Sequence, residues 1–113
     1  MIVCVPVDPS GAVDPRWGRA GRVAVATVED GEIREWRELD VGWDALHDEG
    51  SEAAHHARVV RVLRQNRVDV VVVHHMGEAM SRMLATMGLG VVAGAEGDAR
   101  AAVAAASHGG PGE

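Results

Sequence analysis

The sequence predicts an α/β fold with a mixed five-stranded sheet and flanking helices. Two observations indicate this class. The four consecutive valines at 70–73 are typical of a strand with apolar cover on both faces. In addition, three strand-like segments in succession form the first half of the chain, whereas helix-like and strand-like segments alternate in the second half. The expected element order is therefore β-β-β-α-β-α-β-α, an antiparallel front half followed by two βα crossovers.

Length and composition narrow the class further. We expect the 113 residues to form a single domain over 1–107 followed by a flexible tail over 108–113, and 47% hydrophobic residues supply its core. The chain has no apolar run of about 18 residues, which argues against a membrane span. The net charge of −6 argues against nucleic acid as a partner. No basic region precedes the first apolar segment, so we expect a cytoplasmic protein.

The front half begins with an apolar strand over 2–7, which we expect to lie centrally in the sheet. A turn at 8–11 and an irregular loop at 12–21 follow it. The next strand spans 23–28, and the Asp30-Gly31 pair predicts a hairpin into a strand over 32–39. The imperfect alternation and the charges of this third strand are typical of a sheet edge.

The second half begins with a polar loop at 40–50, and Ser51 is a plausible N-cap for a helix that runs to about residue 66. The valine-rich strand follows at 68–73, and a helix over 78–87 carries a methionine stripe. Gly88 suits the position just after that helix. A last strand spans 89–93, and Asp98 caps a final helix that ends near residue 107.

Four histidines are expected to gather at one edge of the sheet. His74 and His75 directly follow the valine-rich strand, and ligands of open α/β sheets bind beyond the carboxyl ends of the strands. His55 and His56 lie in the first turns of the preceding helix, which runs antiparallel to that strand and so begins near the same edge. Neutral imidazole is the commonest nitrogen ligand of metals. Because adjacent strand residues point to opposite faces, one of His74 and His75 is expected to serve a given site directly. The alternative is that the four histidines are merely tolerated at exposed ends of elements.

The sulfur atoms divide into one candidate ligand and a larger core set. Met76 precedes Gly77 and would tilt the choice of metal toward soft ions. The methionines of the following helix have core spacing: Met80, Met83 and Met87. Cys4, the single cysteine, lies in mid-strand and is expected to be buried and inert.

The loop at 14–20 offers a different kind of site. Arg16 and Arg19 flank Trp17, and arginine side chains suit anionic ligands. The alternative is a solvated loop held in place by Trp17. No nucleophile with a base and an orienting group is visible in the sequence, which argues against an enzyme.

Taken together, these motifs resemble the dinitrogenase iron–molybdenum cofactor biosynthesis family, over roughly residues 2–106. The segment at 16–20 resembles the family's His-Phe-Gly-Arg-Ala loop, and the segment at 28–33 resembles its hairpin. The strand at 68–72 with Gly77 resembles the family's central strand and turn. Three further glycines resemble its closing segment: Gly88, Gly94 and Gly97.

The resemblance implies a ribonuclease H-like fold without nuclease activity, and binding or transfer of a metal cofactor rather than catalysis. Two departures stand out. Arg16 occupies the position where the family's loop usually has histidine, and His74-His75 occupy the positions of two glycines. These departures favour a metal or cluster other than the iron–molybdenum cofactor itself.

The resulting hypothesis is a non-catalytic protein that carries a metal ion or an iron-containing metallocluster. The expected metal ligands are His55, His56, His74 and His75. Met76 is expected to be a further ligand. Trp17 and Arg19 are expected to line the mouth of the site, and Gly77 is expected to let the backbone approach the bound cofactor. A cofactor donor or acceptor protein is the expected partner, and a homodimer would pool two histidine sets. The competing hypothesis is a metal-free module that holds an anionic small molecule or a protein partner through Arg16, Arg19 and the helix N-terminus after Gly77.

Overall fold

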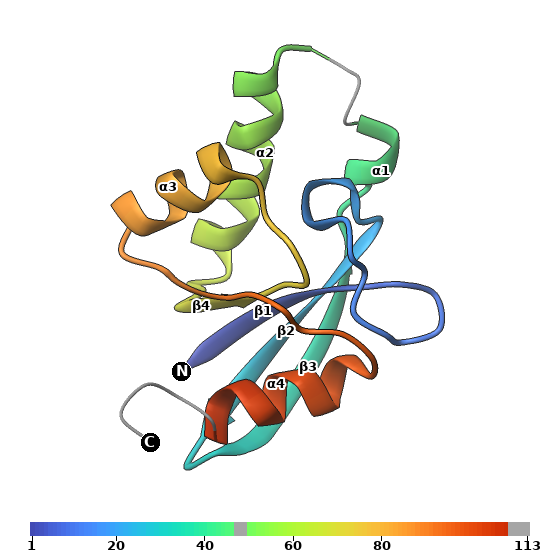
Figure 1. The fold of residues 1–113 in the computed structure, drawn as a ribbon, viewed down its shortest axis with the longest axis vertical. Helices are drawn as coiled ribbons and strands as arrows, with labels where there is room; N and C mark the ends of the chain where they lie inside the picture. The colour runs from blue at the N-terminus through green and yellow to red at the C-terminus, as the bar shows by residue number, and fades with distance from the viewer. Residues whose placement is uncertain (47–49, 109–113) are drawn as a thin grey trace.

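A computed structural model describes residues 1–46 and 50–108, and its element order contains the predicted one. The strands are β1 (Ile2–Val7), β2 (Arg22–Glu29), β3 (Glu32–Asp40), β4 (Val70–Val72) and β5 (Gly90–Val92). The three predicted helices are α2 (Glu52–Gln65), α3 (Glu78–Thr86) and α4 (Ala99–His108). Two short elements are additional, the 3-10 helix η1 (Trp17–Arg19) and the one-turn helix α1 (Trp43–Leu46) (Figure 1).

The five strands form one mixed sheet in the order β3-β2-β1-β4-β5. Strand β1 is the middle strand, as expected, and pairs antiparallel with β2 and parallel with β4. Strand β3 pairs antiparallel with β2 and forms the predicted edge, and β5 forms the other edge in parallel with β4. The carboxyl ends of β1, β3, β4 and β5 therefore share one edge of the sheet.

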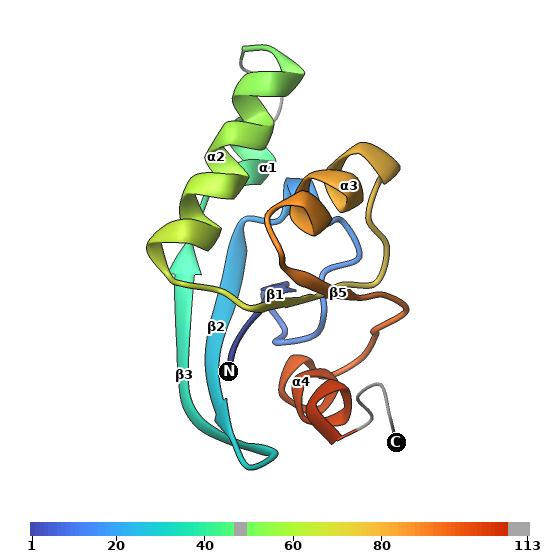
Figure 2. The ribbon, with the colours of Figure 1, turned by 90° about the vertical axis from the view of Figure 1, so that its left-hand side faces the viewer.

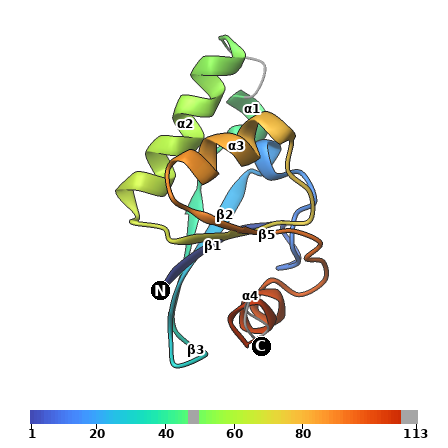
Figure 3. The ribbon, with the colours of Figure 1, turned by 60° about the vertical axis from the view of Figure 1, so that its left-hand side comes forward.

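Helices cover both faces of the sheet and make three layers. Figures 2 and 3 show α2 and α3 on one face and α4 on the other. The core divides in the same way, because Val71 and Val73 belong to the cluster under α2 and α3, whereas Val72 belongs to the cluster under α4. All three valines are fully buried. The prediction that the valine run needs apolar cover on both faces is therefore confirmed.

The hairpin between β2 and β3 forms where the sequence predicts it. Asp30 and Gly31 both have positive φ angles, 53° and 76°, as a type I′ turn requires. A register shift beside the turn aligns Thr27 with Glu35 but Val28 with Ile33. The extra residue in β3 puts Ile33 and Trp36 against the same core cluster. This bulge explains the imperfect alternation of the third strand.

The helix ends follow the predicted capping chemistry. The Ser51 hydroxyl accepts a hydrogen bond from the Ala54 N–H at 3.1 Å at the start of α2. The Asp98 carboxylate accepts one from the Ala101 N–H at 2.9 Å at the start of α4. Gly88, just beyond α3, has a φ of +81°, a conformation that glycine adopts at little cost. These three boundary predictions are confirmed.

Two predictions of the loops need correction. The segment at 40–50 is not simply a polar loop, because α1 forms within it and Trp43 is 1% exposed. Burial of this one indole, rather than helix propensity, accounts for the extra turn. The final helix extends through His108, one residue into the expected tail, and the remaining tail residues 109–113 lie outside the described part of the chain. Within the described residues, no helix is both long and apolar enough to span a membrane.

Candidate functional site

A cleft of about 790 Å³ opens at the carboxyl edge of the sheet. Its walls are the turn around η1, the first turns of α2 and the segment that leads from β4 into α3. The meeting of these three segments agrees with the expectation from the sequence. The cleft brings together seven of the eight predicted site residues: Trp17, Arg19, His55, His56, His75, Met76 and Gly77.

His74 is the predicted residue that does not line this cleft. Its side chain is exposed, and its backbone carbonyl accepts a hydrogen bond from the Gly94 N–H at 2.9 Å. His75, the next residue, does line the cleft. The pair thus separates as expected for adjacent residues at a strand end, and one imidazole of the two serves the cleft.

The two histidines of α2 have different surroundings. His55 is 9% exposed, and its Nε2 lies 2.7 Å from the Gly18 carbonyl oxygen. His56 is half-buried, and its Nε2 lies 3.7 Å from the Glu52 carboxylate one turn earlier. Glu52 and Gly18 both line the cleft and were not predicted as site residues. The i,i+4 spacing of Glu52 and His56 was the available signal for the first, whereas nothing in the sequence marks Gly18 as the partner of a residue 37 positions away.

The two loop arginines also differ. The Arg16 side chain forms an ion pair with Asp14, with 3.3 Å between Nε and Oδ1, and the Asp14 carboxylate is almost completely buried. Arg19 is exposed and lines the cleft, and the structure gives its side chain no hydrogen bond or ion pair within the described ranges. Arg19 is therefore the loop arginine with an uncommitted charge.

The amino end of α3 contributes backbone donors to the cleft. Gly77 is its N-cap and supplies no side-chain cap, and the first residues of the helix line the cleft. The first N–H groups of a helix carry partial positive charge and favour anionic groups. A Cβ built on Gly77 would meet no atom within 4 Å, so the backbone here is open to the cleft.

Trp17 forms the inner wall rather than the mouth of the cleft. Its ring is 4% exposed and packs edge-on against Trp43, with 5.2 Å between ring centroids and 72° between planes. Its Nε1 is buried and has no hydrogen-bond acceptor among the described residues. Trp43 was predicted to lie in a loop, and its role in supporting Trp17 depends on tertiary packing that the sequence does not reveal.

The remaining sulfur side chains belong to the core. Cys4 is fully buried in mid-strand, and burial raises the pKa of its thiol to about 12. Met80 is buried, and Met83 and Met87 pack against the same cluster, which agrees with their expected core role. Met76 is half-buried and lines the cleft. It is thus the methionine placed to contact a ligand there.

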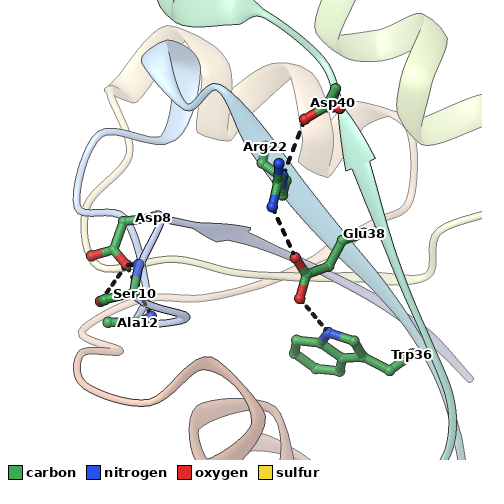
Figure 4. Close-up of polar contacts among 7 residues, drawn as sticks. All are labelled: Asp8, Ser10, Ala12, Arg22, Trp36, Glu38 and Asp40. Carbon is green, nitrogen blue, oxygen red and sulfur yellow. Dashed lines mark hydrogen bonds and ion pairs between the residues drawn. The ribbon is translucent and has the colours of Figure 1, made fainter.

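A second cavity, of about 540 Å³, lies beside the first along the same sheet edge. Two of its carboxylates, Asp14 and Asp40, form ion pairs with arginines. Arg22 contacts Asp40 at 3.1 Å and Glu38 at 3.4 Å, and Glu38 accepts a hydrogen bond from the Trp36 indole (Figure 4). The hydrogen bond to Asp40 is the main cause that raises the pKa of Arg22. Because Arg22 already pairs with Asp40 and Glu38, whereas Arg19 has no ion pair among the described residues, the first cleft is the better candidate for a ligand site.

Within residues 1–46 and 50–108, no three His, Cys, Asp or Glu side chains form a group able to hold a metal ion. The cleft instead combines imidazole and thioether groups with an arginine and a helix amino end. Fold and cleft together define an α/β protein with a cleft at the carboxyl edge of its sheet. The chain belongs to the dinitrogenase iron-molybdenum cofactor family, whose model matches residues 1–109.

Comparison with solved structures agrees with this fold. The crystal structure of PH0822 has a TM-score of 0.77 at 18% identity, over 96% of this chain and 92% of the other. The apo form of the orange protein from Desulfovibrio gigas has a TM-score of 0.76 at 22% identity, over 96% and 88% of the two chains. A search of curated proteins finds no match. At these identities the structural likeness establishes the shared fold alone.

Proposed function

We propose that this protein binds and carries a metal ion or an iron-containing metallocluster in the cleft, without catalysing a reaction. Membership in the dinitrogenase iron-molybdenum cofactor family supports a role connected with metalloclusters. The observation that carries the proposal is that His56, His75 and Met76, from two separate elements, line one cleft. We also assign the mixed sheet to the ribonuclease H-like class that the resemblance implies.

The donor set fits a cluster better than a single bare ion. A structural zinc ion takes four protein ligands in a closed tetrahedron. The described residues hold no such preformed group, and the cleft is large for one ion. A cluster carries its own bridging atoms and needs few protein ligands. Its outer atoms also gain from hydrogen-bond donors and positive charge around it.

Each lining residue then has a distinct part in holding the cargo. His56 and His75 would supply imidazole nitrogens, and Met76 would supply a thioether sulfur, which favours soft ions such as Cu(I). Arg19 and the first N–H groups of α3 would stabilise negative charge on the cargo. The absence of a side chain at Gly77 would let the cargo approach the backbone. Because these groups lie in an open cleft, we expect the cargo to be exchanged with a donor or acceptor protein. In a homodimer, two protomers would combine their imidazole ligands.

Metal analysis of untagged protein, purified without oxygen, tests the proposal. We expect near-stoichiometric metal in the natural protein and a loss of most of it in the double variant His56→Ala, His75→Ala. A polyhistidine tag must be absent because it would bind metal itself. Gln65→Ala, an exposed change at the other end of α2, is the matched control and should retain the metal. Equal metal content in the double variant and the natural protein would refute the site.

The second candidate function is metal-free binding of an anion. The exposed Arg19 beside the amino end of α3 favours it, whereas the ion pair of Arg16 with Asp14 weakens the part predicted for Arg16. Titration with inorganic phosphate separates the two functions. An anion site would bind phosphate saturably, lose it in Arg19→Gln and keep it in the histidine double variant.

A further inference from the structure

The geometry points to a role for His55 that differs from the predicted one. We infer that His55 is not a metal ligand but a latch, which ties the turn around η1 to α2 and so fixes one wall of the cleft. The inference rests on the proposed function for its binding readout. Its structural readouts do not depend on that function.

The ring of His55 is already engaged. Its Nε2 lies 2.7 Å from the carbonyl oxygen of Gly18, and a carbonyl oxygen only accepts hydrogen bonds. Nε2 therefore carries the proton and has no lone pair for a metal. The second ring nitrogen, Nδ1, is buried, and the whole side chain is 9% exposed. Neither nitrogen is presented to a ligand in the cleft.

The turn around η1 needs such a tie. Two local backbone hydrogen bonds close it, from the Arg19 N–H to Arg16 at 3.0 Å and from the Ala20 N–H to Trp17 at 3.4 Å. Its N-cap, Arg16, makes no side-chain capping bond. Moreover, the buried Nε1 of Trp17 has no acceptor among the residues that the structure describes, which favours movement of the indole toward water. The bond from His55 opposes that movement across 37 positions of sequence.

The lack of a side chain at Gly18 allows the close approach of His55. A Cβ built on Gly18 would lie 3.3 Å from Nε2 of His55, closer than most Cβ contacts in proteins. The backbone of Gly18 is not in the left-handed region, so glycine is needed here for close approach rather than for conformation. The two residues thus form one contact that either partner can weaken.

The latch has a consequence for the ligands. His56 follows His55 on the first turns of α2, so anchoring His55 also fixes where His56 lies relative to His75 across the cleft. His55 is therefore a positioning residue. The ligand set becomes His56, His75 and Met76.

Two substitutions at His55 separate a latch from a ligand. Glutamine retains an N–H donor at the ε position but is a poor metal ligand, whereas alanine removes the donor. The probe is Cu(I), titrated against a coloured competing chelator. The structural readouts are near-UV circular dichroism of the stacked Trp17 and Trp43 and amide hydrogen exchange at Arg19 and Ala20, both measured without metal. Gly18→Ala weakens the same contact from the other side, and Gln65→Ala is the control on α2.

For a latch, we expect His55→Gln to bind Cu(I) within about twofold of the natural protein and to keep its circular dichroism. His55→Ala and Gly18→Ala should weaken binding about fivefold, the factor that matches one net hydrogen bond, and should speed exchange at the turn. Equal loss of binding in the glutamine and alanine variants, with both structural readouts unchanged, would show that His55 is a ligand. Unchanged readouts in both His55→Ala and Gly18→Ala would also overturn the latch. If the natural protein binds no Cu(I), the cleft does not hold a single soft ion, and the two structural readouts still decide the latch.

Discussion

Replacing Trp17 by phenylalanine isolates the effect of one buried N–H group. The ring is 4% exposed, and its Nε1 is buried with no acceptor in the described part of the chain. A buried donor without a partner costs about 1–3 kcal/mol of stability, which the substitution recovers. The smaller ring leaves roughly 40 Å³ of space, which costs about 1 kcal/mol. The variant should therefore be between about 0 and 2 kcal/mol more stable than the natural protein.

Trp43 provides the matched comparison because the two rings pack on each other. It is 1% exposed, but its Nε1 is not among the buried side-chain atoms that lack a partner. Trp43→Phe therefore leaves the same empty space without removing an unpaired buried N–H group, and its free energy of unfolding should fall by about 1 kcal/mol. The free energies of unfolding of the two variants are expected to differ by about 1–3 kcal/mol, although both replace tryptophan by phenylalanine.

Urea unfolding followed by far-UV circular dichroism measures this difference. We expect the midpoint of Trp17→Phe to equal or exceed that of the natural protein, and the midpoint of Trp43→Phe to fall, with similar slopes for all three. The reasoning is refuted if Trp17→Phe is the less stable of the two variants. That result would mean that the indole N–H of Trp17 has an acceptor in solution.

Three further predictions concern single residues. Cys4 has a thiol pKa of about 12, so at pH 8 a disulfide reagent should modify the native protein at least about 1000-fold more slowly than the urea-unfolded chain; comparable rates would contradict its burial. The hydroxyl of Ser10 and the N–H of Ala12 lower the pKa of Asp8, so the charged carboxylate stabilises the fold above its ordinary range near pH 4, and that contribution is lost as pH falls through the lowered pKa. Asp8→Asn should therefore be less stable than the natural protein at neutral pH and match it in acid, as measured by thermal unfolding, and a constant difference at every pH would argue against this origin. Gly88→Ala should lower stability by about 1 kcal/mol because of the φ of +81°, since no atom lies within 4 Å of the added methyl group; an unchanged melting temperature would show that the turn adapts.

Local sequence signals predicted the elements that depend on local chemistry. The Asp30-Gly31 turn, the Ser51 cap and the position after α3 follow from conformational preferences of one or two residues, and all agree with the structure. The run of valines predicted a strand buried on both faces because no other arrangement covers so many apolar side chains. The family resemblance is confirmed by the match over residues 1–109.

The features of the fold and the cleft that the sequence could not predict depend on contacts between distant segments. The sequence around Trp43 predicts a loop, whereas in the structure Trp43 packs against Trp17, which lies 26 positions earlier. His55 and His56 have the same residue type and adjacent positions, yet one is buried against Gly18 and the other faces Glu52. The antiparallel course of α2 relative to β4 predicted that its amino end would lie at the carboxyl edge of the sheet. It could not predict which imidazole the neighbouring turn would cover.

The position of β1 in the middle of the sheet has a consequence for how the chain folds. Its contacts with β2 close over short separations, whereas its pairing with β4 joins Val3 to Val70 and is reinforced by the bond from the Ile2 N–H to Asp69, 67 positions away. Because closing a long loop is slow, we expect the β1–β2–β3 meander to form before β4 docks on it. His75 and Met76 follow β4 directly, so we expect the cleft to be complete only after β4 has docked. We therefore expect the cleft to open more readily than the meander in the native state, so that the proposed cargo would enter without unfolding the meander that supports the cleft.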